Sequence, residues 1–253
     1  MSKKLVLPVE LEAPEKQYVI TGAIYSIACF FSLPFLFLLV SDGFHNDIGA
    51  LSWFEIAFHI LNFVVIGKLF KEYLSDSLLA LQLHKDTVIT VTAITVGVML
   101  GIGLLWHFLY LFTGNEALYL AAFGVIPLSE MDILTLSGHV VITNPVFGTL
   151  CMTLLVPVIT GCLYYAIGFT PFYNIKPWLG YLVVSLAVAF PRICNAMTYW
   201  IPEEELVLYV AQLPVHLVSC WAYRKTDTVW TPIIAHMIVN LIGAVVLIVL
   251  YGL

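Results

Sequence analysis

The sequence predicts an all-α fold, a polytopic bundle of transmembrane helices. Hydrophobic residues make up 61% of the 253 residues and charged residues only 10%, with a mean hydropathy of +1.00; a soluble domain usually carries about 25% charged residues. Apolar runs of about 20 residues recur, each long enough to cross the roughly 30 Å hydrocarbon layer. They do not alternate polar and apolar residues as β-barrel strands do. We therefore expect membrane lipid around the chain, no nucleic-acid partner, and a multi-pass location in the cell membrane.

Seven long apolar runs predict seven spans in one domain, residues 18–253. The runs cover approximately residues 18–41, 52–70, 87–113, 146–169, 177–194, 205–223 and 229–251. The first follows the polar segment 1–17 and lacks a small-residue cleavage site, so we expect a retained span behind a cytoplasmic N-terminal segment.

Two further segments are too polar or too short to cross. The stretch FKEYLSDSLLALQLHKD between the second and third runs mixes charges with helically spaced leucines, which predicts an interfacial amphipathic helix. Within residues 114–143, the piece ALYLAAFGVIP predicts a short re-entrant or surface segment.

The basic residues predict the orientation. With the N-terminus in the cytoplasm, seven crossings place nine of the ten basic residues inside and only Arg192 toward the outside. The inner nine are Lys3, Lys4, Lys16, Lys68, Lys71, Lys85, Lys176, Arg224 and Lys225. The acidic run Glu203 to Glu205 falls at the outer start of the sixth span, where acids favour a helix N-terminus.

The cysteines predict small buried thiols and no cofactor. All five fall in or beside apolar runs, and none shows metal-ligand spacing such as CxxC. They are Cys29, Cys151, Cys162, Cys194 and Cys220.

A polar pair in the last span is the main candidate site. His236 and Asn240, in TPIIAHMIVN, are four residues apart and share one helix face, roughly 10 Å or more below the inner surface. Polar groups inside a membrane are costly and are functional candidates by default. They also serve as hydrogen-bonding contacts between helices, so both interpretations stay open.

The segment WAYRKTDTVWTPIIAHMIVN resembles the third motif region of the CPBP family, the CAAX-protease and bacteriocin-processing (Abi) intramembrane proteins. That family has a short basic turn before an apolar segment ending in HxxxN. Here the turn is Tyr223 to Thr226 and the motif is His236 with Asn240. The resemblance covers about residues 68–245 and implies a bacterial source.

The first two family motifs are degenerate in this chain. Where the first motif, EExxxR, has two glutamates and an arginine, the chain has Thr160, Gly161 and Tyr165. The second motif, FxxxH, falls at Ile193, or at Phe190 with Cys194 after a shift of one residue, and neither register supplies a histidine.

In active members, the resemblance implies, a glutamate and the second-motif histidine activate water, while the third-motif His and Asn stabilise the oxyanion. A general base must accept a proton near neutral pH, which threonine and glycine cannot do. The sequence therefore favours a pseudoprotease in which Thr160, Tyr165, His236 and Asn240 line a cavity that is structural or binds a partner.

Other polar groups in the spans could replace the missing base. Glu55 and His59 are four residues apart on the second span and are weak candidates for a metal or an acid–base pair. His107 and His216 are interpreted as packed, hydrogen-bonded residues. No HExxH motif is present.

These residues lead to two alternative hypotheses for the function of the chain. The first is a catalytically degenerate CPBP-like binding, scaffold or immunity-type protein for a membrane or cell-envelope protein or peptide. The second is an active intramembrane protease with a rearranged site, built on His236 and an acid such as Glu55.

Overall fold

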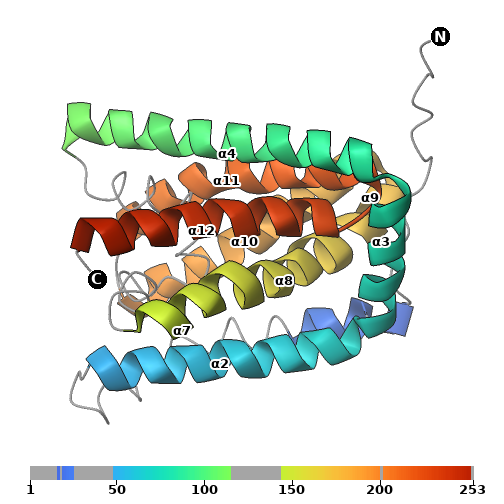
Figure 1. Cartoon of the computed structure of the whole chain (residues 1–253), viewed down its shortest axis with the longest axis horizontal. Helices are drawn as coiled ribbons and strands as arrows, with labels where there is room; N and C mark the ends of the chain where they lie inside the picture. The colour runs from blue at the N-terminus through green and yellow to red at the C-terminus, as the bar shows by residue number, and fades with distance from the viewer. Residues whose placement is uncertain (1–15, 18, 26–47, 115–143, 200–201, 252–253) are drawn as a thin grey trace.

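A computed structural model describes residues 16–17, 19–25, 48–114, 144–199 and 202–251, and the secondary structure of these ranges is helical. The long helices run side by side, with α3 crossing one end of the bundle (Figure 1). The elements, η denoting a π-helix, are α2 (Ile48–Leu69), α3 (Lys71–Leu83), α4 (Lys85–Thr113), α7 (Pro145–Leu150), η1 (Cys151–Leu155), α8 (Val156–Thr160), η2 (Gly161–Phe169), α9 (Thr170–Ile175), α10 (Pro177–Tyr199), α11 (Pro202–Thr226) and α12 (Trp230–Tyr251).

The all-α membrane fold is confirmed, and each of the last six predicted spans coincides with a helix or a helical rod. Five described stretches are long and apolar enough to cross a membrane: Ser52–Leu69, Lys85–Thr113, Pro145–Ile175, Pro177–Cys194 and Glu205–Thr226. The apolar stretch in α12, Trp230–Val246, is slightly shorter. The first predicted span is described only at its start, where residues 19–25 are helical. The rest of it, with Cys29 and the short segment predicted within 114–143, lies outside the described residues.

The segment from α7 to α9 forms one helical rod at the centre of the described bundle. In an apolar segment of 18 residues within it 67% of the residues are buried, against 28% in the corresponding segments of α2 and α4. The rod lies between α2 on one side and α12 on the other (Figure 1). By contrast, α4 turns large apolar side chains such as Leu104 and Phe112 outward. That pattern fits a helix facing lipid.

The predicted interfacial helix is α3, and hydrogen bonds fasten it to the turn between α11 and α12. The Thr228 hydroxyl donates to the Ser77 carbonyl (2.7 Å), and the Val229 amide donates to the Ser77 hydroxyl (3.0 Å). The Trp230 indole donates to the Leu74 carbonyl (2.9 Å). Asp227 has a left-handed backbone (φ 52°), which reverses the chain between the two helices. The turn next to the HxxxN helix is therefore held by specific bonds.

These bonds gather basic residues at one end of the bundle. Lys68, Lys71 and Lys85 lie at the ends of α2, α3 and α4. Arg224 and Lys225 are in the last turn of α11, which the Ser77–Thr228 bonds place beside α3. The Arg224 guanidinium lies 5.7 Å from the ring centre of Tyr173 in α9, next to Lys176. Six of the predicted inner basic residues therefore share one end of the bundle.

Replacing Thr228 with valine should loosen the α3 contact. The change removes a buried hydroxyl that bonds to Ser77 and accepts from the Trp230 amide (3.3 Å), leaving buried partners unsatisfied. We expect a loss of about 1–3 kcal/mol, seen as a lower Tm of the detergent-solubilised protein. The matched control is Thr90→Val, because the exposed Thr90 hydroxyl bonds only to the Asp86 carbonyl of its own helix. Equal Tm values for both variants would show that α3 does not depend on this contact.

Candidate functional site

His236 and Asn240 both point into the protein and are fully buried. The His236 ring stacks on the ring of Tyr165 in η2, with centroids 6.3 Å apart and an interplanar angle of 26°. It also lies 6.1 Å from the ring of His216 in α11. The third-motif histidine therefore meets one of the first-motif positions and a histidine outside the three motifs.

His216 completes an aromatic group that we call the imidazole–tyrosine cluster, made of Tyr164, Tyr165, His216 and His236. The Tyr165 hydroxyl lies 3.3 Å from His216 Nδ1, within hydrogen-bond distance. The Tyr164 ring meets His216 edge to face at 4.8 Å. All four side chains are buried. From the sequence, His216 was interpreted as a packed, hydrogen-bonded residue, because no motif spacing links it to His236.

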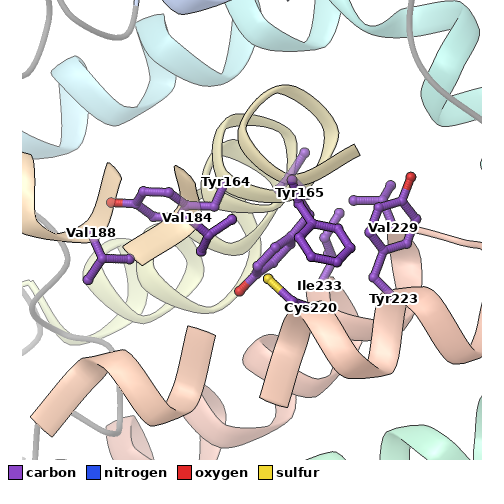
Figure 2. Packing of buried hydrophobic residues seen from close by; sticks show 10 residues of the cluster. Tyr164, Tyr165, Val184, Val188, Cys220, Tyr223, Val229 and Ile233 are labelled. Atoms are coloured by element: carbon purple, nitrogen blue, oxygen red, sulfur yellow. The ribbon is translucent and has the colours of Figure 1, made fainter. Parts of the chain in front are cut away.

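Figure 2 shows how the two tyrosines diverge from η2. Tyr164 extends toward Val184 and Val188 of α10, and Tyr165 lies over Cys220 and Ile233. Thr170 is the first residue of α9, and its hydroxyl donates to the Tyr165 carbonyl and to the Tyr223 hydroxyl. Tyr223 bonds in turn to Tyr73 of α3 (2.6 Å). Burial, and next the neighbouring Tyr223, raise the pKa of Tyr73 well above its ordinary value, so the Tyr73 hydroxyl is neutral at physiological pH.

Asn240 satisfies a backbone carbonyl of the central rod. In η1 the Val156 amide bonds to the Cys151 carbonyl, five residues back, and is not available to Met152. The residue that would continue this pattern for Met152 is Pro157, which has no N–H. Asn240 Nδ2 donates to the Met152 carbonyl at 2.7 Å instead. Its Oδ1 has no hydrogen-bond partner among the described residues.

The two glutamate positions of the first motif are filled by local packing. The Thr160 hydroxyl is buried and donates within its own helix, to the carbonyls of Val156 (3.0 Å) and Pro157 (3.3 Å). A Cβ atom on Gly161 would lie 2.4 Å from Ile233 Cγ1. Glycine at this position therefore allows α12 to pack directly on the rod, and no room is left for a carboxylate.

The second-motif positions do not add a base to the cluster. The α10 residues that pack against the two tyrosines are Val184 and Val188. Ile193 is 54% exposed on the outer face of α10. Cys194 is buried, but it lies six residues beyond Val188, roughly 9 Å along the helix. Neither register of the second motif therefore places an ionisable group beside His236.

Near Cys194, α10 and α11 share a buried ion pair. Arg192 Nη1 lies 3.3 Å from Glu205 Oε2, and Arg192 Nη2 donates to Gln212 Oε1 at 2.9 Å. The pair borders a largely apolar groove of about 810 Å³. Glu205 is therefore a buried ion-pair partner in the first turn of α11, where Arg192 compensates its charge.

Glu55 and His59 form a separate buried pair on α2, with His59 Nε2 3.7 Å from Glu55 Oε1. The rod from α7 to α8 lies between α2 and α12 (Figure 1). Glu55 is thereby kept away from His236. Within the described ranges, no three His, Cys, Asp or Glu side chains are grouped so that they could hold a metal ion.

Comparison with known proteins supports the resemblance over part of the chain. Residues 142–242 match the Rce1-like family model, described as type II CAAX prenyl endopeptidase Rce1-like. The match runs from just before α7 into α12 and includes every member of the imidazole–tyrosine cluster. No curated protein and no solved structure matches the chain. The predicted family resemblance is thus confirmed over these residues, and the match leaves the state of the motifs open.

The structural role of Asn240 is tested by a double-mutant cycle with Pro157. Asn240→Ala leaves the Met152 carbonyl buried without a donor and should lower stability by about 1–3 kcal/mol. Pro157→Ala restores an N–H near that carbonyl, so the same Asn240 substitution should cost less in that background. Chemical denaturation in detergent measures both costs. An equal cost in the two backgrounds would show that Asn240 does not act through this carbonyl.

The contact between Gly161 and Ile233 is tested in the same way. Gly161→Ala places a Cβ against the Ile233 side chain and should cost about 1–3 kcal/mol by overpacking. Adding Ile233→Ala removes both clashing atoms and should lower that penalty. The control is Gly97→Ala, because nothing lies within 4 Å of a Cβ at this α4 position. A harmless Gly161→Ala in thermal melts would contradict the close approach of α12.

Proposed function

We propose that the chain is a non-catalytic membrane protein with a CAAX-endopeptidase-like core, whose imidazole–tyrosine cluster serves packing or binding. The observation that carries this proposal is the state of the third motif. His236 is stacked on Tyr165, and Asn240 already donates to the Met152 carbonyl. The name of the matched family indicates the reaction expected of its active members, which is hydrolysis of a prenylated CAAX peptide.

The residues at the first-motif positions support the loss of hydrolysis. Activation of water requires a general base within hydrogen-bond reach of the reacting proton. Thr160 donates to its own helix, and Gly161 has Ile233 packed against it. Removal of one member of a catalytic unit commonly reduces kcat by several orders of magnitude. The first-motif positions alone therefore argue for a very weak or absent peptidase activity.

The role we propose in its place is binding of a membrane or cell-envelope protein or peptide, as a scaffold or an immunity-type factor. The basic residues at the α3 end support an orientation with this end in the cytoplasm. The buried cluster then lies in the cytoplasmic half of the bundle. The absence of glutamates at the first-motif positions favours a fold that is retained for recognition. The helices pack together without these catalytic groups.

One observation favours a second function, an active peptidase with a rearranged site. His216 and His236 come from different helices, and their rings lie 6.1 Å apart. An imidazole can act as a general base near neutral pH. His216 is better placed for this than Glu55, which lies across the central rod. Such an enzyme would use His216 as the base and His236 to polarise the substrate carbonyl.

The two functions are separated by incubating the protein, reconstituted in liposomes, with a farnesylated CAAX peptide. We expect no cleavage above the level of His236→Ala, because no carboxylate activates water at the cluster. Mass spectrometry detects the released tripeptide, and a thermal melt checks the fold of each variant. His107→Ala, outside the cluster, is the matched control. Cleavage by wild type and His107→Ala that disappears in His216→Ala and His236→Ala would establish the peptidase and contradict our proposal.

A further inference from the structure

A polar face runs along α2, on the other side of the central rod from the imidazole–tyrosine cluster. Ser52, Glu55, His59 and Asn62 follow one another at intervals of three, four and three residues, so they share one face. Ser52, His59 and Asn62 are buried, and the Glu55 side chain is only 11% exposed. The face packs toward α7, η1 and α8. A stripe of this kind inside a membrane points to a function.

The side chain of Asn62, at the C-terminal end of this polar face, has hydrogen-bond partners among the described residues, whereas those of Glu55 and His59 at its centre do not. Asn62 accepts from the Tyr25 hydroxyl (2.5 Å) and donates to the Phe58 carbonyl (2.9 Å). Both carboxylate oxygens of Glu55 and both ring nitrogens of His59 lack a hydrogen-bond partner in the described part of the chain. The separation of 3.7 Å between His59 Nε2 and Glu55 Oε1 is too long for a hydrogen bond.

Buried polar atoms without partners are costly, and in hydrocarbon no surrounding solvent compensates them. The partner of Glu55 and His59 is therefore expected to be a group other than the described side chains. The observed geometry fits one ion shared by both groups. Two ligand atoms each about 2.0–2.2 Å from a zinc ion at a tetrahedral angle lie about 3.3–3.6 Å apart, so the observed separation of 3.7 Å is close to that of two ligands of one ion.

From this geometry we propose that Glu55 and His59 bind a divalent transition-metal ion, of which Zn²⁺ is the best match. An imidazole nitrogen with a carboxylate oxygen is a donor set that suits zinc. Two protein ligands leave the other positions to water.

The site is independent of the proposed non-catalytic function. The rod separates it from His236, so the metal would tie α2 to the rod without entering the imidazole–tyrosine cluster. Its chemical consequence is local. A bound cation would compensate the charge of the Glu55 carboxylate inside the membrane and would take the His59 imidazole as a neutral ligand.

The test is direct metal binding by the purified, chelator-stripped protein in detergent. Zn²⁺ is titrated calorimetrically, and Co²⁺ is added in parallel because its visible absorption reports coordination. We expect wild type to bind one equivalent and gain thermal stability. Glu55→Gln and His59→Gln, both close in shape to the native residues, should each weaken binding at least tenfold. The control is His216→Gln, which changes a histidine on the other side of the rod.

The outcomes that overturn the proposal are distinct. Absence of Zn²⁺ binding by folded wild type would do so, as would equal affinity in Glu55→Gln and His59→Gln. Loss of binding in His216→Gln with retention in both α2 variants would place the ion in the imidazole–tyrosine cluster instead. If one α2 variant fails to fold, the other still decides, because each removes one ligand. Peptidase activity plays no part in any readout.

Discussion

Each backbone carbonyl inside the bilayer needs a donor from within the protein, and the central rod meets this demand at Met152 through Asn240. Pro157 provides no N–H, and the π-helical step of η1 gives the Val156 amide to Cys151. Asn240 crosses from α12 to make up the deficit at 2.7 Å. This bond fixes the register of the last helix against the rod. The positions of His236 and Ile233, on the same helix, follow from that register.

The same register brings α12 close to the rod, so that the residues aligned with the first motif serve as packing positions in this structure. Ile233 lies where a side chain on Gly161 would begin, and the Tyr165 ring stacks on His236. In an enzyme this space has to admit water and substrate. Here it is filled by a methyl-bearing side chain and an aromatic ring. Under the proposed non-catalytic function, the threonine and glycine at the two glutamate positions and the tight packing of Ile233 are two aspects of one change, since an isoleucine can fill only a space that no carboxylate occupies.

Much of the fold could be read from local patterns. Apolar runs located the helices from α2 to α12, because the thickness of the bilayer sets a length that a sequence shows directly. The HxxxN pair was found because four-residue spacing defines one helix face. His216 was not recognised as part of the site, since its partners Tyr165 and His236 come from other helices and no spacing encodes them. Glu205 was interpreted as an acid at a helix N-terminus, and its ion pair was not foreseen, because its partner Arg192 is 13 residues away on another helix.

The π-helical segments mark the limit of sequence reasoning in this chain. Pro157 signals a disturbed helix, but whether a chain bends, breaks or shifts to five-residue bonding depends on which groups nearby can donate. The donor here is the side chain of Asn240, which is 88 residues from Met152 in the sequence. A motif residue that family resemblance assigns to oxyanion stabilisation thus acquires a structural explanation that needs no substrate. The Glu55–His59 pair differs in that none of its carboxylate oxygens or ring nitrogens has a hydrogen-bond partner within the described chain.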